Sequence, residues 1–152
     1  MDVADLADRL RALEDREAIR DLVARYGPLA DAGEAGAVAA LWTADGTYQV
    51  AGFAAAGGHA QIAALITGDA HRALLADGCA HLLGPVTIAL EGDTATARGH
   101  SVVLRHSGGA FGVHRVSANR WSFARTVEGW RVTHRTNALL DGAEAARALL
   151  AS

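Results

Sequence analysis

The chain contains no lysine and has only one cysteine, one methionine and two prolines among 152 residues. Because it is alone, Cys79 cannot form an internal disulfide or a metal site with several thiolate ligands. All 14 basic residues are arginines, and against 17 acidic residues they leave a formal charge of -3. A nucleic-acid surface is therefore disfavoured, since phosphate binding needs an excess of positive charge.

Long apolar runs are also missing, and none approaches the ~18 residues that span a bilayer. Residues 1–11 mix acids and bases where a secretory signal would be apolar. Hydrophobic residues nevertheless make up 51% of the chain and charged residues 20%, which is enough apolar surface to support folding. We therefore expect a single domain over residues 1–152, located in the cytoplasm and acting on a small molecule rather than on nucleic acid or a membrane.

Helical periodicity dominates the first half of the chain. Apolar residues recur every three or four positions over residues 3–13 and again over residues 19–29. This spacing predicts a long or two-part helix that Pro28 should bend or end, because its ring removes a backbone hydrogen bond. Three further elements are predicted next: a helix over 34–42, a strand over 47–53 and a helix over 59–76.

After Gly78 the pattern changes to period two, with β-branched and aromatic residues between glycine-containing turns. The predicted elements are strands over 80–91, 94–107, 110–127 and 130–137, and a closing helix over 141–150. Helices followed by a run of hairpins predict an α+β fold. In this fold a curved antiparallel sheet packs against an N-terminal helical layer.

Seven histidines raise the question of a metal site. No His-Glu-x-x-His motif is present. The hairpin predicted at residues 108–109 would pair Val103 with His114, which puts His114 on the face opposite His100 and His106. Three histidines on two faces make poor zinc ligands. We therefore expect no metal, and interpret these residues as surface or hydrogen-bonded histidines.

An acid–base site is the remaining candidate for chemistry. Asp31 follows the proline, His81 begins the first long predicted strand, and Arg135 lies near the end of the last one. A carboxylate bonded to one imidazole nitrogen fixes the tautomer and leaves the other nitrogen free to accept a proton. Asp31 and His81 are therefore candidate catalytic residues. The alternative is that Asp31 caps a helix and His81 is solvated.

Substrate contacts are expected from aromatic and polar side chains around the same pocket. Tyr26 and Tyr48 can donate hydrogen bonds to an apolar ligand, and Trp42 and Asn119 are candidates to line the pocket with them. Core packing explains Trp42 equally well.

Arg135 can stabilise an enolate or a leaving anion, or it can pair with a nearby acid. Strict alternation along its strand would place it on the same face as Arg131 and Thr133, opposite Trp130.

Several short segments together follow one family pattern: residues 17–22 (Glu-Ala-Ile-Arg-Asp-Leu), Tyr26, Asp31, residues 41–46 (Leu-Trp-Thr-Ala-Asp-Gly) and residues 129–135 (Gly-Trp-Arg-Val-Thr-His-Arg). In their order and separation they resemble the SnoaL-like branch of the nuclear-transport-factor-2-like superfamily, from about residue 13 to residue 137. The resemblance implies a cone-shaped α+β barrel around an apolar pocket, and homodimers or higher homo-oligomers. Since the superfamily includes both enzymes and binding modules, it does not fix the activity.

Within that superfamily the chain is most usefully similar to scytalone dehydratase and hexachlorocyclohexane dehydrochlorinase. Asp31 and His81 match the Asp–His dyad of these enzymes. Arg135 follows Trp130 by five residues, as an arginine does in the dehydrochlorinase, whereas Tyr26 replaces a lysine of that enzyme. The resemblance implies a cofactor-free lyase, isomerase or cyclase that takes a proton from carbon of an apolar small molecule. The alternative is a non-catalytic module that binds a small molecule or forms dimers.

Overall fold

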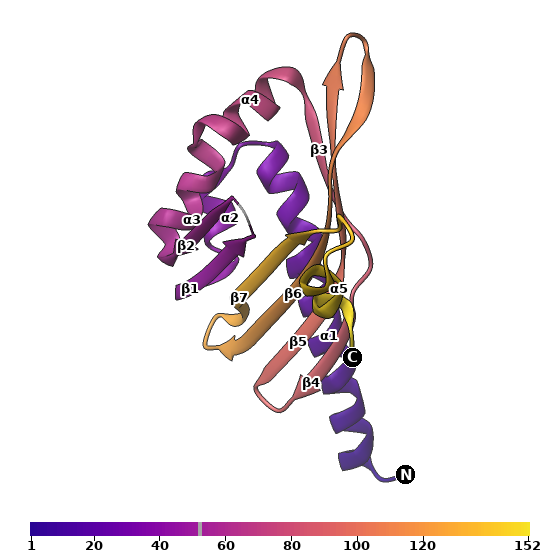
Figure 1. The fold of residues 1–152 in the computed structure, drawn as a ribbon. Coiled ribbons are helices and arrows are strands. Elements are labelled where there is room, and N and C mark those ends of the chain that lie inside the picture. Colours follow the sequence, from indigo (N-terminus) through magenta and orange to yellow (C-terminus); the bar gives the residue numbers. More distant parts are fainter. Residues whose placement is uncertain (52) are drawn as a thin grey trace.

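The computed structural model describes residues 1–51 and 53–152 (Figure 1). In chain order the elements are α1 (Val3–Asp31), α2 (Ala35–Ala39), β1 (Trp42–Val50), β2 (Ala54–Gly57), α3 (Gly58–Thr67), α4 (Asp69–Asp77), β3 (Cys79–Leu83), β4 (Thr87–Glu91), β5 (Thr94–Ser107), β6 (Ala110–Thr126), β7 (Gly129–Leu139) and α5 (Glu144–Leu150). The predicted α+β class is confirmed. None of the helices within these residues combines the length and apolar character needed to cross a membrane.

The strands form one sheet in the order β2-β1-β7-β6-β5-β3, and β4 also pairs with β5. The expectation of a wholly antiparallel sheet is wrong at one pair, because β1 runs parallel to β7. A parallel pair cannot be joined by a tight turn. The chain instead leaves β1 through β2, α3 and α4 and runs through the hairpin strands before it returns as β7 (Figure 1).

The predicted strand over residues 80–91 is two strands, β3 and β4, on either side of Pro85. Proline lacks the backbone N–H that a sheet ladder requires, which explains the interruption. Both strands pair with β5, β3 near its end and β4 near its start. The hairpin of β5 and β6 extends beyond the other strands (Figure 1).

Helix α1 runs through Pro28 and ends at Asp31, so of the two outcomes predicted at Pro28, a bend or an end, the end is wrong. The helix closes at Gly33, whose positive φ of 71° suits the left-handed position after a helix end. The backbone N–H of Glu34 donates to the carbonyl of Leu29 across this turn. The closing glycine, rather than the proline, therefore sets where Asp31 lies.

Other boundaries shift by a few residues. Helix α2 is shorter than the predicted 34–42 because Trp42 already belongs to β1. The predicted strand over 47–53 includes Gly52, which lies outside the described residues. The predicted helix over 59–76 is divided into α3 and α4 at Gly68, whose backbone is extended. Helix α5 begins at Glu144, three residues later than predicted.

The main core lies between the inner face of the sheet and α1. Its largest fully buried apolar side chains are Trp42, Trp121, Phe123, Ile19, Leu41, Ile62, Val38 and Val132. Helix α5 covers the opposite face, where Arg98 and Arg120 donate to the carbonyl of Ala151 just beyond the helix. By contrast, the first turns of α1 project past the sheet, and Val3, Leu6 and Leu10 are exposed there (Figure 1).

Candidate active site

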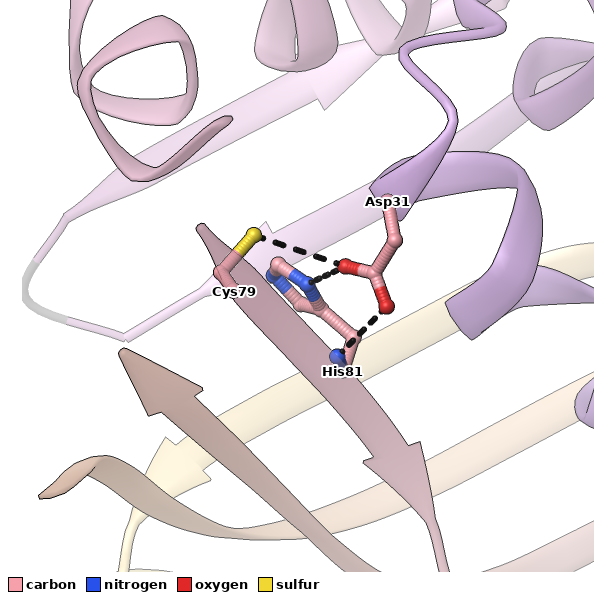
Figure 2. Close-up of side chains that lie close together, drawn as sticks. All are labelled: Asp31, Cys79 and His81. Carbon is pink, nitrogen blue, oxygen red and sulfur yellow. Dashed lines mark hydrogen bonds and ion pairs between the residues drawn. The ribbon is translucent and has the colours of Figure 1, made fainter. Parts of the chain in front are cut away.

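The carboxylate of Asp31 and the imidazole of His81 form a direct hydrogen bond, with Nδ1 of His81 2.6 Å from Oδ1 of Asp31 (Figure 2). The second carboxylate oxygen accepts from the backbone N–H of His81 at 2.9 Å. The thiol of Cys79 lies 3.5 Å from Oδ1. The structure thus brings together the two residues that the sequence proposed as a dyad, across 50 residues of chain.

A glycine allows this contact. A Cβ atom placed on Gly27 would lie 2.1 Å from the carbonyl oxygen of His81, so only glycine lets α1 approach β3 this closely. Asp31 is the last residue of α1, where the negative end of the helix dipole disfavours a carboxylate. Its position therefore does not stabilise the helix, and the helix-cap interpretation of Asp31 does not hold.

Burial lowers the pKa of His81 below its usual value, while the hydrogen bond and charge of Asp31 act in the opposite direction. His81 is therefore neutral near pH 7. Since Nδ1 donates its proton to Asp31, the tautomer leaves Nε2 with a free lone pair. This is the arrangement that a general base needs.

A cavity of about 410 Å³ adjoins the imidazole. It is lined by Tyr26, Tyr48, Val50, Phe53, Leu65, Ile66, Ala70, His71, Ala73, Leu74, His81, Leu83, Ser101, Val102, Val103, Arg105, His114, Arg115, Ser117, Arg135 and Asn137. Of the predicted substrate contacts, Tyr26, Tyr48 and Arg135 therefore lie on the wall. Trp42 and Asn119 do not, and both are buried behind it.

Trp42 stacks on Tyr48 with ring centroids 5.6 Å apart, so it supports the wall from the core. Burial strongly raises the pKa of the Tyr48 hydroxyl, which keeps this group protonated as a hydrogen-bond donor.

Arg135 is 2% exposed and faces the cavity. Its Nε and Nη2 donate to Oδ1 of Asn119 at 2.9 and 2.7 Å, whereas Nη1 has no hydrogen-bond partner among the described residues. The guanidinium carbon lies 4.3 Å from the ring centroid of Tyr26 and 4.1 Å from that of Trp121. Aromatic faces rather than a carboxylate thus compensate the buried charge.

The face predicted for Arg135 is wrong. The pairing between β6 and β7 shifts by one residue, from Ser122 with His134 to Phe123 with Val132. The extra residue, Thr133, reverses the alternation. Arg135 therefore shares the inner face with Val132, and not with Arg131.

A similar irregularity corrects the histidine pairing. Val103 pairs with Arg115 rather than with His114, because the register of β5 and β6 shifts there. Arg115 consequently lines the cavity. In the described part of the chain, His100, His106 and His114 do not form a ligand cluster.

Within these residues the group with metal-ligand chemistry is Asp31, Cys79 and His81 (Figure 2). The separation of 2.6 Å between Nδ1 and Oδ1 is a hydrogen-bond length, and two ligands on a tetrahedral zinc ion lie about 3.4 Å apart. Burial, together with Asp31, raises the pKa of the Cys79 thiol to about 11. The geometry and the protonated thiol of this cluster therefore fit hydrogen bonding rather than coordination of a metal ion.

The sequence reasoning missed a set of polar residues beside Arg135. Ser101 accepts from Asn119 at 2.8 Å, and Asn137 donates to Asn119 at 3.0 Å. It also missed His71, a buried residue of α4 whose ring centroid lies 5.3 Å from that of His81. The signal for Asn137 was its pairing with Asn119 across β6 and β7, but the bulge at Thr133 hid their common face.

Comparison with known proteins supports the architecture. The SnoaL-like domain family matches residues 11–136. An NTF2-like protein with a cystatin-like fold from Novosphingobium aromaticivorans is 66% identical, with a TM-score of 0.98 over 99% of this chain and 98% of that one. Aln2 from a Streptomyces species is 23% identical, with a TM-score of 0.76 over 89% and 96%.

ActVI-ORFA from Streptomyces coelicolor is 20% identical, with a TM-score of 0.72 over 84% of this chain and 98% of that one. At this identity the likeness to the two Streptomyces proteins concerns the fold alone. No curated protein matches the chain. The family match over most of the chain confirms the resemblance drawn from the sequence: the chain belongs to the SnoaL-like domain family and has the NTF2-like fold.

Proposed function

We propose that this protein is a cofactor-free acid–base enzyme that removes a proton from carbon of an apolar small molecule. His81 is the base and Asp31 orients it. The observation that supports the proposal most strongly is the 2.6 Å hydrogen bond between the two side chains, with His81 on the wall of the cavity. The reaction classes that fit are elimination, as in a dehydratase-like lyase, isomerisation and cyclisation.

The proposed reaction uses the free lone pair on Nε2 of His81. Nε2 of His81 takes the proton of an acidic C–H bond, and the carboxylate of Asp31 stabilises the imidazolium that forms. The electron pair of that bond moves onto a neighbouring carbonyl oxygen or expels a leaving group from the adjacent carbon. The positive charge of Arg135 and the neutral hydroxyl of Tyr48, both at the cavity wall, can stabilise the negative charge that develops.

A binding module of the same fold needs a cavity but does not need this polar arrangement. Burying a cation without a carboxylate partner is costly, and so is burying a carboxylate. Arg135 is such a cation on the cavity wall, and Asp31 is a partly buried carboxylate directly behind His81. A catalytic role gives both groups a use, and on this ground we favour the enzyme.

The test uses 5-nitrobenzisoxazole, a small flat compound with one acidic C–H bond. Removal of its C3 proton turns the C–H electron pair into a nitrile bond, breaks the N–O bond and releases a coloured nitrophenolate. We expect saturable turnover by the protein. His81→Gln should slow it about 100-fold or more, since general-base catalysis contributes ~100 to 10,000-fold.

The matched control is His100→Gln, which changes an exposed histidine outside the cavity lining. This variant should keep the wild-type rate, and circular dichroism should show both variants folded. Equal rates for wild type and His81→Gln would refute the proposal and leave a binding module as the better account.

A further inference from the structure

The charges around the cavity point to a substrate class, and this inference rests on the proposed function of the same site. We propose that the substrate of this protein carries an anionic group, such as a carboxylate, and that Arg115 binds this group while the C–H bond faces His81. The ligand is then an apolar acid rather than a neutral apolar molecule.

Cationic groups outnumber anionic ones on the wall. Three arginines line the cavity, and no aspartate or glutamate of the described residues does. Asp31 lies behind His81, and its carboxylate already accepts the Nδ1–H and the backbone N–H of that residue. Arg105 is neutralised by Asp77, to which its Nε donates at 2.7 Å. The excess positive charge therefore resides on Arg115 and Arg135.

Neither of these two arginines forms an ion pair in the part of the chain that the structure describes. Nε of Arg115 donates to Oγ of Ser117 at 2.9 Å, and Nη2 donates to Oδ1 of Asn137 at 3.1 Å. Both partners are neutral, so they orient the guanidinium without neutralising its charge. A planar fork held in this way suits a carboxylate.

The hydrogen bonds around Arg115 and Arg135 also leave donors rather than acceptors available. Oδ1 of Asn119 accepts from Arg135 and from Asn137, and Oδ1 of Asn137 accepts from Arg115. Oγ of Ser101 accepts from Asn119, which leaves its own hydroxyl proton free. A wall with surplus N–H and O–H groups is complementary to an anion and a poor match for a ligand that donates hydrogen bonds.

We assign different roles to the guanidinium groups of Arg115 and Arg135. Asn137 and Asn119 lie between them in the hydrogen-bonded chain, so the two side chains occupy separate positions on the wall. Arg135, packed on Tyr26 and Tyr48, lies by the aromatic part of the cavity, where charge develops in the proposed reaction. Arg115, which is only half-buried, is the residue that meets a charge the substrate already carries.

The experiment compares two probes of nearly equal shape, 2-naphthoate and 2-naphthamide, by isothermal titration calorimetry at pH 7. We expect the wild-type protein to bind the carboxylate about tenfold more tightly or better, as charged hydrogen bonds contribute more than neutral ones. Arg115→Gln should remove most of this preference and leave the affinity for the amide unchanged. Arg115→Lys should retain part of it, because the charge remains.

Arg72→Gln is the matched control, since it removes one exposed arginine that does not line the cavity. It should keep the wild-type preference, and thermal melts should show each variant folded. Equal affinity for the two probes, no naphthoate binding at millimolar concentration, or a preference unchanged in Arg115→Gln would each overturn the inference.

The outcomes separate this inference from the proposed function. His81→Gln should keep the preference for the carboxylate, because His81 does not bind it. A retained preference without His81-dependent turnover of 5-nitrobenzisoxazole would contradict the proposed function alone. His81-dependent turnover with no preference for the carboxylate would contradict the anionic substrate alone.

Discussion

The inner face of β5, β6 and β7 has two ends of opposite character. The apolar end, which packs against α1, consists of Ala95, Ala97, Phe123, Trp130 and Val132. The polar end, which borders the cavity, consists of Ser101, Ser117, Asn119, Arg135 and Asn137. Both ends are buried, so burial does not explain their difference.

The apolar end stabilises the fold in the ordinary way, through burial of apolar surface and close packing. The polar end gains little of this stabilisation, because desolvation of its amides and guanidinium offsets their hydrogen bonds. We infer that the apolar end serves folding and the polar end serves the ligand. Substitutions at the two ends should therefore separate stability from activity.

The largest effect on stability is expected at the apolar end. Phe123→Ala should lower the free energy of unfolding by about 3–5 kcal/mol, because it empties a fully packed position. Urea denaturation followed by tryptophan fluorescence measures this loss. Val127→Ala, at a residue that is fully exposed, should change the free energy by less than about 0.5 kcal/mol.

The same measurement on Arg135→Met sharpens the contrast. Replacing a buried cation that lacks a carboxylate partner with an apolar side chain should change the free energy of unfolding by less than about 1 kcal/mol. Turnover of 5-nitrobenzisoxazole should fall about 100- to 1,000-fold, the typical loss for one donor to developing negative charge. A loss of stability as large as that of Phe123→Ala would assign Arg135 to the structural core instead.

Gly27 is the residue at which α1 packs closely against β3, next to His81. Gly27→Ala should destabilise the protein by about 1–3 kcal/mol, as overpacking does, because the new Cβ meets the carbonyl of His81. It should also slow turnover, since Asp31 and His81 are pushed apart. Gly36→Ala is the control: apart from its chain neighbours and the backbone of its own helix, no atom lies within 4 Å of its added Cβ. That variant should be neutral or slightly stabilising, with unchanged turnover.

The smallest expected effect is on pH dependence. Because burial lowers the pKa of His81, kcat/KM should rise with pH and level off below pH ~6.5, the usual value for histidine. Asp31 raises this pKa, so Asp31→Asn should move the rise to lower pH. The free energy of unfolding changes with pH in the same direction. The unfolded chain binds the proton of His81 more tightly than the folded chain, so the contribution of neutral His81 to stability is lost as pH falls below ~6.5. A rise centred above pH 7 would contradict the assignment.

Sequence periodicity was sufficient for the fold class and for most elements, because helical and alternating patterns reflect which faces are buried. It failed where a single residue changes the register. Thr133 and the shift beside His114 each reverse an alternation, and they decide that Arg135 and Arg115 face the cavity. Such bulges leave no clear trace in hydrophobic patterning.

Asp31 and His81 could be proposed because both lie at predicted element boundaries and match a family pattern. Their contact could not be derived, since it depends on how closely α1 approaches β3 at Gly27. Trp42 and Asn119 were proposed as wall residues on residue type alone. Whether an inward-facing side chain contacts a ligand or is covered by other side chains depends on three-dimensional packing. In the structure this packing places Trp42 and Asn119 behind the cavity wall.

The central claim is that Asp31 acts through His81, and a double-mutant cycle tests it most directly. In the wild-type background, Asp31→Asn should slow turnover of 5-nitrobenzisoxazole by about tenfold or more, and His81→Gln by about 100-fold or more. In the His81→Gln background, Asp31→Asn should cause no further loss. Independent, multiplicative losses in the double variant would contradict the account.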